Sequence, residues 1–205
     1  MGIAKQAAML RAARNSALIR TFPPTGTVKC DGARLFRSQA ARDVGCLLDV
    51  NESVVSWRCM PMPFGAGGIV HVPDFEVHNE DGGILYLDAP DRGTSVDVTL
   101  LATEAKRLNA RYRLLERGEI YDGFRLRNAR DLLRYAATVT PLGDRLRLLG
   151  ALEENGSLPL AECLNVFQEV RPVPGLASLV LHGYVEIDLD GAPIGPESSV
   201  RRISR

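Results

Sequence analysis

Two aspartates near the middle of the chain have the residue type and spacing of a divalent-metal site. Asp74 lies in the apolar run HVPDFEV at residues 71–77, and Asp88 ends the next run, ILYLD at residues 84–88. The residues between the runs, NEDGG, are typical of a tight chain reversal. Two paired strands would then present one carboxylate each on the same face. Such oxygens suit Mg²⁺ or Mn²⁺, and a metal held in this way can promote phosphodiester cleavage.

The group that would activate water in such a site is missing at the expected place. An amine two residues after Asp88 would share its face of the strand, but Pro90 stands there and has neither an amine nor a backbone N–H. Glu104 and Lys106, on the next predicted helix, are weak candidates for a displaced carboxylate and amine. An exposed helix face explains both more simply. From these residues alone, solvated aspartates at strand ends remain the alternative interpretation.

The elements around the two aspartates predict an α/β domain. Apolar spacing from Leu35 indicates a helix, and Val54 to Trp57 reads as a strand. The predicted hairpin comprises Ile69 to Val77 and the strand ending at Asp88, and strict alternation places His71 on the face opposite Asp74. A helix near residues 100–108, a strand near 112–115 and a helix over 124–136 follow. This order predicts a small mixed sheet with helices around it.

After residue 140 the pattern changes to short helices. One helix ends at Asn155-Gly156, a second follows Pro159, and a third begins near Pro174 and ends at Gly183. Alternating residues from Val185, a turn at residues 190–191 and a return over 200–203 predict a hairpin. Three helices and a hairpin are typical of a winged helix-turn-helix. We therefore expect a basic N-terminal arm or helix (1–33), an α/β domain (34–122) and a helical, winged-helix-like domain (123–205).

Composition and charge restrict the class of protein. The formal net charge is +0, and no apolar run approaches the length of a membrane span. The basic residues of the first twenty positions interrupt any apolar signal segment, so we expect a cytoplasmic protein. The four cysteines lack paired metal-ligand spacing, which predicts reduced thiols rather than a zinc site.

Arginines give two segments a basic character despite the neutral total. The helix over 124–136 carries a basic series, and the chain ends in a second basic cluster, either of which could contact DNA phosphates or simply be solvated. The candidate DNA-binding residues are Arg125, Arg127, Arg130, Arg134, Arg201 and Arg202.

Several short motifs, in order along the chain, resemble the TnsA endonuclease subunit of heteromeric bacterial transposases, a member of the PD-(D/E)xK nuclease superfamily. They are the RSQAARD run at 37–43, VVSW at 54–57, HVPDFEV at 71–77, LYLDAP at 85–90 and RNAR at 127–130. The resemblance covers residues from about 34 to the end. It implies a restriction-endonuclease-like domain followed by a winged-helix-like domain. It also implies DNA, a transposase subunit and a transposition ATPase as partners, at the bacterial nucleoid.

The resemblance carries over only part of the family's active site. Asp74 matches the metal-binding aspartate and Asp88 the second acidic position, with Mg²⁺ or Mn²⁺ as cofactor if the site is active. The helix glutamate is absent, since Arg37 or Ala41 occupies its place, and the lysine is Pro90. An arginine at that place would bring a positive charge to where the metal binds.

Three functions are consistent with these residues. The first is a catalytically degenerate TnsA-like protein that binds DNA ends or a partner transposase without cutting. The second is an active metal-dependent endonuclease, cutting one strand at transposon ends, with a site completed by Glu104 or Lys106. The third is a winged-helix transcriptional regulator. The expected recognition helix, PGLASLVLH at 174–182, carries no arginine or lysine, which favours protein contact over base readout.

Overall fold

The computed structural model describes residues 3–65, 70–92 and 97–203 and divides the chain into two compact units. The N-terminal unit comprises Met1–Pro23 and Lys29–Ile120, and the C-terminal unit comprises Pro24–Val28 and Tyr121–Arg205. The short segment at 24–28 thus belongs to the unit formed mainly by the second half of the chain. Among the described residues, no helix is long and apolar enough to cross a membrane.

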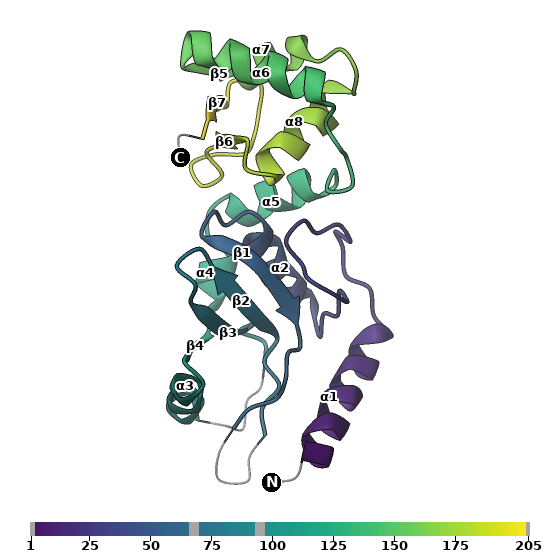
Figure 1. The fold of residues 1–205 in the computed structure, drawn as a ribbon, viewed down its shortest axis with the longest axis vertical. Coiled ribbons are helices and arrows are strands. Elements are labelled where there is room, and N and C mark those ends of the chain that lie inside the picture. Colours follow the sequence, from purple (N-terminus) through teal and green to yellow (C-terminus); the bar gives the residue numbers. More distant parts are fainter. Residues whose placement is uncertain (1–2, 66–69, 93–96, 204–205) are drawn as a thin grey trace. The chain divides into compact units, whose positions relative to one another are not determined.

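The N-terminal unit is built on a four-stranded sheet in the order β1-β2-β3-β4, whose strands lie side by side in Figure 1. β1 and β2 pair antiparallel, as do β2 and β3, whereas β3 and β4 run parallel. The predicted α/β class with a mixed sheet is therefore confirmed. The elements in chain order are α1 (Ile3–Leu18), α2 (Gln39–Asp49), β1 (Val54–Cys59), β2 (Phe75–Asn79), β3 (Ile84–Asp88), α3 (Val98–Arg107), β4 (Ala110–Leu114) and α4 (Arg117–Tyr121).

The two faces of this sheet are covered by different groups. On one face Trp57 is fully buried against Phe36 and Phe75, with ring centroids 6.1 and 5.6 Å away. On the other face Tyr86 and Tyr112 pack with Phe64 and with the apolar side of α3. Strand alternation separates the two groups, because Trp57 and Phe75 lie on one side of the pleat and Tyr86 on the other.

The first strand of the predicted hairpin is shorter than expected. The expected strand began at Ile69, which lies outside the described residues, whereas β2 begins only at Phe75. Pro73 has no backbone N–H and cannot donate to a ladder, so residues 70–74 approach the sheet without joining it. Within this stretch His71 pairs with Phe64 through an isolated bridge. Similarly, α2 begins at Gln39 rather than near Leu35, because Ser38 caps it by accepting the Ala41 N–H at 3.1 Å.

The C-terminal unit combines helices with a three-stranded antiparallel sheet in the order β5-β7-β6. Its core is formed by α6, α8 and the sheet, with Leu148, Leu152, Leu179 and Val200 almost fully buried. The expected helices and hairpin are present, but β5 was not predicted. Its elements are α5 (Arg125–Leu133), α6 (Leu142–Asn155), β5 (Ser157–Pro159), α7 (Leu160–Cys163), η1 (Leu164–Val166), α8 (Pro172–Leu181), β6 (Val185–Ile187) and β7 (Ser199–Arg202).

Candidate functional site

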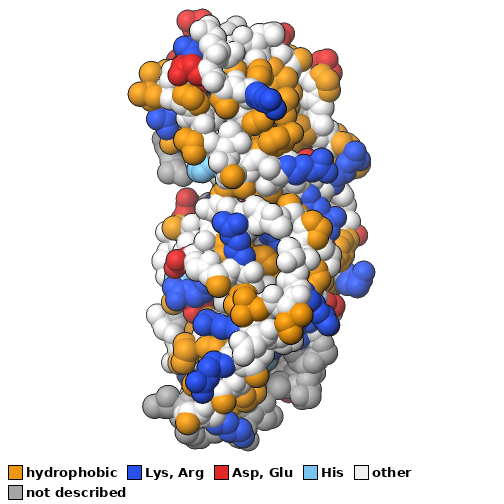
Figure 2. Space-filling view, turned by 90° about the vertical axis from the view of Figure 1, so that its right-hand side faces the viewer, with side chains coloured by type: hydrophobic (Ala, Val, Ile, Leu, Met, Phe, Trp, Pro, Cys, Tyr) orange, Lys and Arg blue, Asp and Glu red, His pale blue; other side chains and the backbone are white. Residues whose placement is uncertain are grey.

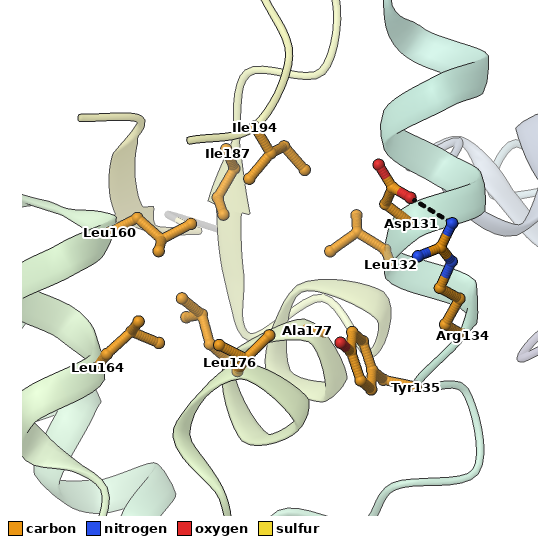
Figure 3. A pocket seen from close by; sticks show the side chains of 11 residues that line it. Asp131, Leu132, Arg134, Tyr135, Leu160, Leu164, Leu176, Ala177, Ile187 and Ile194 are labelled. Carbon is orange, nitrogen blue, oxygen red and sulfur yellow. Dashed lines mark ion pairs between the residues drawn. The ribbon is translucent and has the colours of Figure 1, made fainter. Parts of the chain in front are cut away.

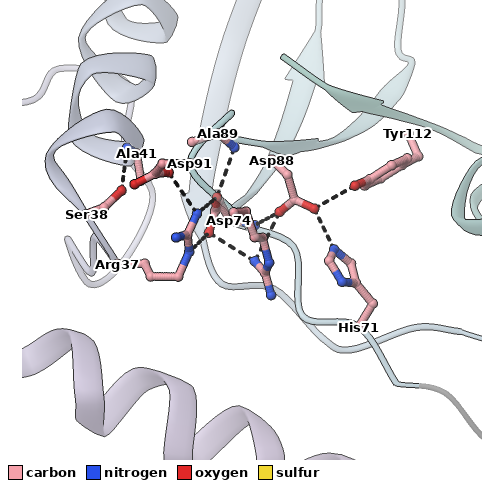
Figure 4. Close-up of polar contacts among 10 residues, drawn as sticks. Arg37, Ser38, Ala41, His71, Asp74, Asp88, Ala89, Asp91 and Tyr112 are labelled. Atoms are coloured by element: carbon pink, nitrogen blue, oxygen red, sulfur yellow. Dashed lines mark hydrogen bonds and ion pairs between the residues drawn. The ribbon is translucent and has the colours of Figure 1, made fainter. Parts of the chain in front are cut away.

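Asp74 and Asp88 face each other where β2 and β3 meet the loops that flank them (Figure 4). The register pairs Phe75 with Leu87, so the next position brings the two aspartates opposite each other. Each carboxylate accepts a backbone N–H from the other segment. The Asp74 N–H donates to Asp88 Oδ1 at 2.8 Å, and the Ala89 N–H donates to Asp74 Oδ2 at 3.0 Å. Both side chains are buried, with 2% and 0% exposed.

Two arginines neutralise this acidic pair. Arg37, which immediately precedes the cap of α2, binds Asp74 with two hydrogen bonds, from Nε to Oδ1 at 3.0 Å and from Nη2 to Oδ2 at 2.8 Å. Arg92 Nη1 bridges the pair, at 3.0 Å from Asp74 Oδ1 and 3.1 Å from Asp88 Oδ1. Arg37 also lies 3.3 Å from Asp91. Arg37, one of the two residues expected in place of a metal-binding glutamate, is therefore a cation in direct contact with Asp74.

His71 and Tyr112 complete the surroundings of Asp88. His71 Nε2 is 2.6 Å from Asp88 Oδ2, and the Tyr112 hydroxyl donates to the same oxygen at 2.7 Å. Burial alone would raise the pKa of Asp88, but the His71 hydrogen bond and the Arg92 charge outweigh it and hold that pKa below its ordinary value. Burial together with the Asp88 charge raises the pKa of Tyr112 far above the usual range, so Tyr112 is a neutral donor.

The hydrogen-bonding capacity of both carboxylates is used. A carboxylate has about four lone-pair sites. Each oxygen of Asp74 accepts two hydrogen bonds, and so does each oxygen of Asp88. A divalent metal would have to displace donors and approach against two guanidinium charges. The residues present therefore do not fit Mg²⁺ or Mn²⁺. Within the described ranges, no cluster of three or more His, Cys, Asp or Glu could hold a metal ion.

The two weaker candidates are not among the partners of the aspartates. On α3, Glu104 accepts from Arg107 Nη1 at 2.6 Å, and Lys106 is exposed to solvent. Conversely, sequence reasoning missed Arg92, Tyr112 and His71, the last of which was expected on the opposite face. Pro73 ends the strand alternation before residue 74, which is why that expectation was wrong. A proline between His71 and Asp74 was the one signal that regular alternation would not hold there.

Most of the arginines proposed for DNA contact are paired with acids in their own unit. Arg127 is exposed and Arg130 is partly buried. The pairs are Arg125–Asp190 at 2.7 Å, Arg134–Asp131 at 3.2 Å, Arg201–Glu186 at 3.3 Å and Arg202–Glu153. On the face drawn in Figure 2, many Lys and Arg side chains lie among apolar and uncharged groups.

The C-terminal unit also contains a mostly apolar cavity of about 280 Å³ (Figure 3). Its wall is formed by aliphatic side chains from several elements, and the Asp131–Arg134 ion pair lies at one side. A cavity of this size and lining suits a branched aliphatic or aromatic group. The lining residues are Asp131, Leu132, Arg134, Tyr135, Leu160, Leu164, Val173, Leu176, Ala177, Ile187 and Ile194.

Comparison with known proteins adds no relative: no protein-family model and no curated protein matches the chain.

Proposed function

We propose that the chain is a TnsA-like transposition protein with a nuclease-type fold that no longer cleaves DNA, and that it acts by binding DNA ends or a partner transposase. The observation that carries this proposal is the occupation of Asp74 and Asp88 by Arg37 and Arg92. A nuclease of this superfamily needs these oxygens for its metal. Here the same oxygens form a buried ion-pair network, whose chemistry is structural.

The fold supports the same assignment. A mixed sheet whose acidic pair lies on a β-hairpin is the arrangement that the TnsA resemblance implies. In the C-terminal unit, the element order α6, β5, α7, α8, β6, β7 is that of a winged helix. These finer assignments rest on element order together with the short motifs, and they belong to the proposal.

The winged-helix-like unit is better suited to contact a protein than to read bases. α8, with the sequence PVPGLASLVL, carries no charged side chain. Base readout normally uses Arg, Lys, Asn or Gln. On β7, Arg201 and Arg202 are paired with Glu186 and Glu153, and DNA would have to compete for them. The apolar cavity beside α8 could receive an anchoring side chain from a partner.

A cleavage assay tests the central claim. Purified protein is incubated with supercoiled plasmid and Mg²⁺ or Mn²⁺, and the expected result is intact plasmid. Asp74→Ala is the control for trace contamination, because a contaminating nuclease would act equally in both preparations. Nicking or linearisation by the natural protein, lost in Asp74→Ala, would show an active site and remove the proposal.

A restored acidic site provides a positive test. Arg37→Glu places a carboxylate beside Asp74, and the repulsion should destabilise the N-terminal unit without metal. Mn²⁺ should then raise its unfolding midpoint, with a gain in the free energy of unfolding of about 2.7 kcal/mol at a concentration one hundred times the Kd. The natural protein should show no shift. Arg58→Glu is the matched control, since Arg58 is a half-exposed arginine on β1 that pairs with Glu76. A Mn²⁺ shift in the natural protein, equal to that of Arg37→Glu, would contradict the proposal.

DNA binding is measured separately by the anisotropy of a labelled duplex. We expect affinity to weaken as salt rises, because the contacts are to phosphates. Arg127→Gln should weaken binding uniformly across sequences, whereas Lys106→Gln, on α3 of the other unit, should leave it unchanged. If the duplex fails to bind even at low salt, partner binding alone remains as the proposed role.

A further inference from the structure

Two of the four cysteines lie together in the N-terminal unit. Cys30 belongs to the segment before α2 and forms a parallel β-bridge with Trp57. Two backbone hydrogen bonds hold the bridge, from the Asp31 N–H to the Trp57 carbonyl at 2.7 Å and from the Trp57 N–H to the Lys29 carbonyl at 3.0 Å. Bridge partners point to the same side of a sheet, and Cys59 lies two residues beyond Trp57 on that side. The two thiols therefore share one face.

The thiols of Cys30 and Cys59 influence each other's pKa and are unequal. The hydrogen bond from Cys59 lowers the pKa of Cys30, whereas the same hydrogen bond and burial raise the pKa of Cys59 far above the usual range. Cys30 is half-buried, and Cys59 is 4% exposed. Cys30 is thus the more nucleophilic and more accessible thiol, with Cys59 beside it as a second sulfur.

We propose that Cys30 and Cys59 are a redox modification site, oxidised to an intramolecular disulfide by low-molecular-weight disulfides. The inference is independent of the proposed function. The Cys30 thiolate attacks one sulfur of the small disulfide and expels a thiolate, which forms a mixed disulfide. The Cys59 sulfur then displaces the second small thiolate, and the expelled thiolates take up the two protons of the cysteines. Two protein thiols are oxidised while one small disulfide is reduced to two thiols.

Forming this bond requires the backbone at Cys30 to approach Cys59. A disulfide needs Cα atoms within about 7 Å. Apart from the single bridge at Cys30, residues 20–38 form no helix or strand, so Cys30 can adjust toward β1. The bond would enclose α2 and most of β1 in one covalent loop. It would therefore restrict the unfolded chain and stabilise the N-terminal unit.

The test uses the full chain and oxidised glutathione. After exposure, the protein is denatured and alkylated with N-ethylmaleimide, and its intact mass is measured by mass spectrometry. The reduced protein should take up four maleimides, one for each cysteine. The oxidised protein should take up about half as many, with peptide mapping identifying a Cys30–Cys59 link. Trp57 fluorescence should show a higher urea midpoint for the oxidised protein, reversed by a thiol reductant.

The chain provides its own matched controls. Cys46 and Cys163 are both fully buried, and Cys46→Ser and Cys163→Ser should each retain the bond. Cys30→Ser should lose it, and Cys59→Ser should leave a glutathione adduct on Cys30. Full alkylation of the oxidised natural protein would overturn the proposal, as would a link that involves Cys46 or Cys163. Peptide mapping of the natural protein decides the matter even if a serine variant fails to fold.

Discussion

At the scale of single residues, the acidic pair illustrates how a buried charge is made tolerable. Asp74 and Asp88 lie almost out of contact with water, yet every oxygen has its donors and two arginines balance the charge. Removing one partner from such a network leaves a buried charge partly uncompensated, which is costly. The network should therefore be sensitive to small changes in its donors.

Tyr112→Phe tests one donor of this network. The change keeps the ring packed near Phe64 and His71, at 6.2 and 5.8 Å, and removes only the hydroxyl that donates to Asp88. Because the acceptor is charged, we expect the free energy of unfolding to fall by about 1–2 kcal/mol. Urea unfolding followed by Trp57 fluorescence measures it, since Trp57 is the single tryptophan and lies in the same unit.

Tyr86→Phe is the matched control for this prediction. Tyr86 stacks on Phe64 at 4.8 Å, on the same face of the sheet, and within the described part of the chain its hydroxyl has no hydrogen bond to protein. Its loss should change stability by less than about 0.5 kcal/mol. Equal losses for the two variants would mean that the Asp88 contact contributes nothing specific.

At the scale of elements, the sequence predicted those helices, strands and turns that apolar alternation or turn residues mark locally. The hairpin around residues 79–83, the strand at 54 and the helices after 140 were all visible in apolar spacing. β5 was missed because its three residues show no periodicity and pair only with β7, more than 40 residues away in sequence.

The residues of the candidate site were likewise predictable only in part. Asp74, Asp88 and Arg37 could be placed by motif, because the hairpin register and the start of α2 follow from local sequence. Tyr112 reaches Asp88 only through the parallel β3–β4 register, and Arg92 folds back from the loop after β3. Those contacts depend on tertiary structure, which no local pattern in this chain specifies.

The first turn of α6 contains a buried carboxylate that binds the backbone of the segment preceding α8. Asp144 accepts the N–H groups of Gln168, Glu169 and Val170 at 2.8, 3.0 and 2.9 Å. Arg147 adds a charged donor at 2.6 Å. Burial opposes ionisation, but these hydrogen bonds outweigh it and lower the pKa of Asp144 from the ordinary 3.8 to about 2.

Asp144→Asn should therefore destabilise the C-terminal unit, by about 2–4 kcal/mol at neutral pH, because the amide presents donors to backbone N–H groups. A lowered folded pKa contributes stability that is fully present above the unfolded pKa and is lost as pH falls through the folded value. The natural protein should thus lose this contribution between about pH 4 and 2, and the variant should not. Far-UV circular dichroism measures both.

Asp131→Asn is the control for Asp144→Asn. Asp131 is a half-exposed acid on α5 whose only described ion pair is with Arg134, and its loss should cost less than about 1 kcal/mol. An equally large effect at Asp131, or an unchanged acid dependence in Asp144→Asn, would contradict the role assigned to Asp144.

At the scale of the whole molecule, the chain does not divide at a single point. It enters the C-terminal unit at Pro24–Val28, returns to the N-terminal unit at Lys29 and leaves again after Ile120. Each unit has its own buried apolar residues, centred on Trp57 in one and on Leu148 and Leu179 in the other. A cut after residue 120 would thus separate the C-terminal unit from five residues that belong to it.

Gly26→Ala tests whether the segment at 24–28 contributes to the stability of the C-terminal unit. A Cβ at Gly26 would lie 2.6 Å from the Leu133 carbonyl oxygen and 2.8 Å from the Ala136 Cβ, so the segment must shift. We expect a loss of about 1–3 kcal/mol. Because the clash lies in one unit, circular dichroism should report a lower midpoint while the Trp57 fluorescence midpoint stays unchanged.

Gly150→Ala should instead raise the stability of the same unit. Gly150 lies inside α6, where an added Cβ would meet nothing within 4 Å, and alanine favours a helix by about 0.5–1 kcal/mol. Its circular dichroism midpoint should rise, again without a change in Trp57 fluorescence. If Gly26→Ala instead lowered the Trp57 midpoint and left the circular dichroism of the C-terminal unit intact, the 24–28 segment would belong to the N-terminal unit. The division of the chain would then need to be redrawn.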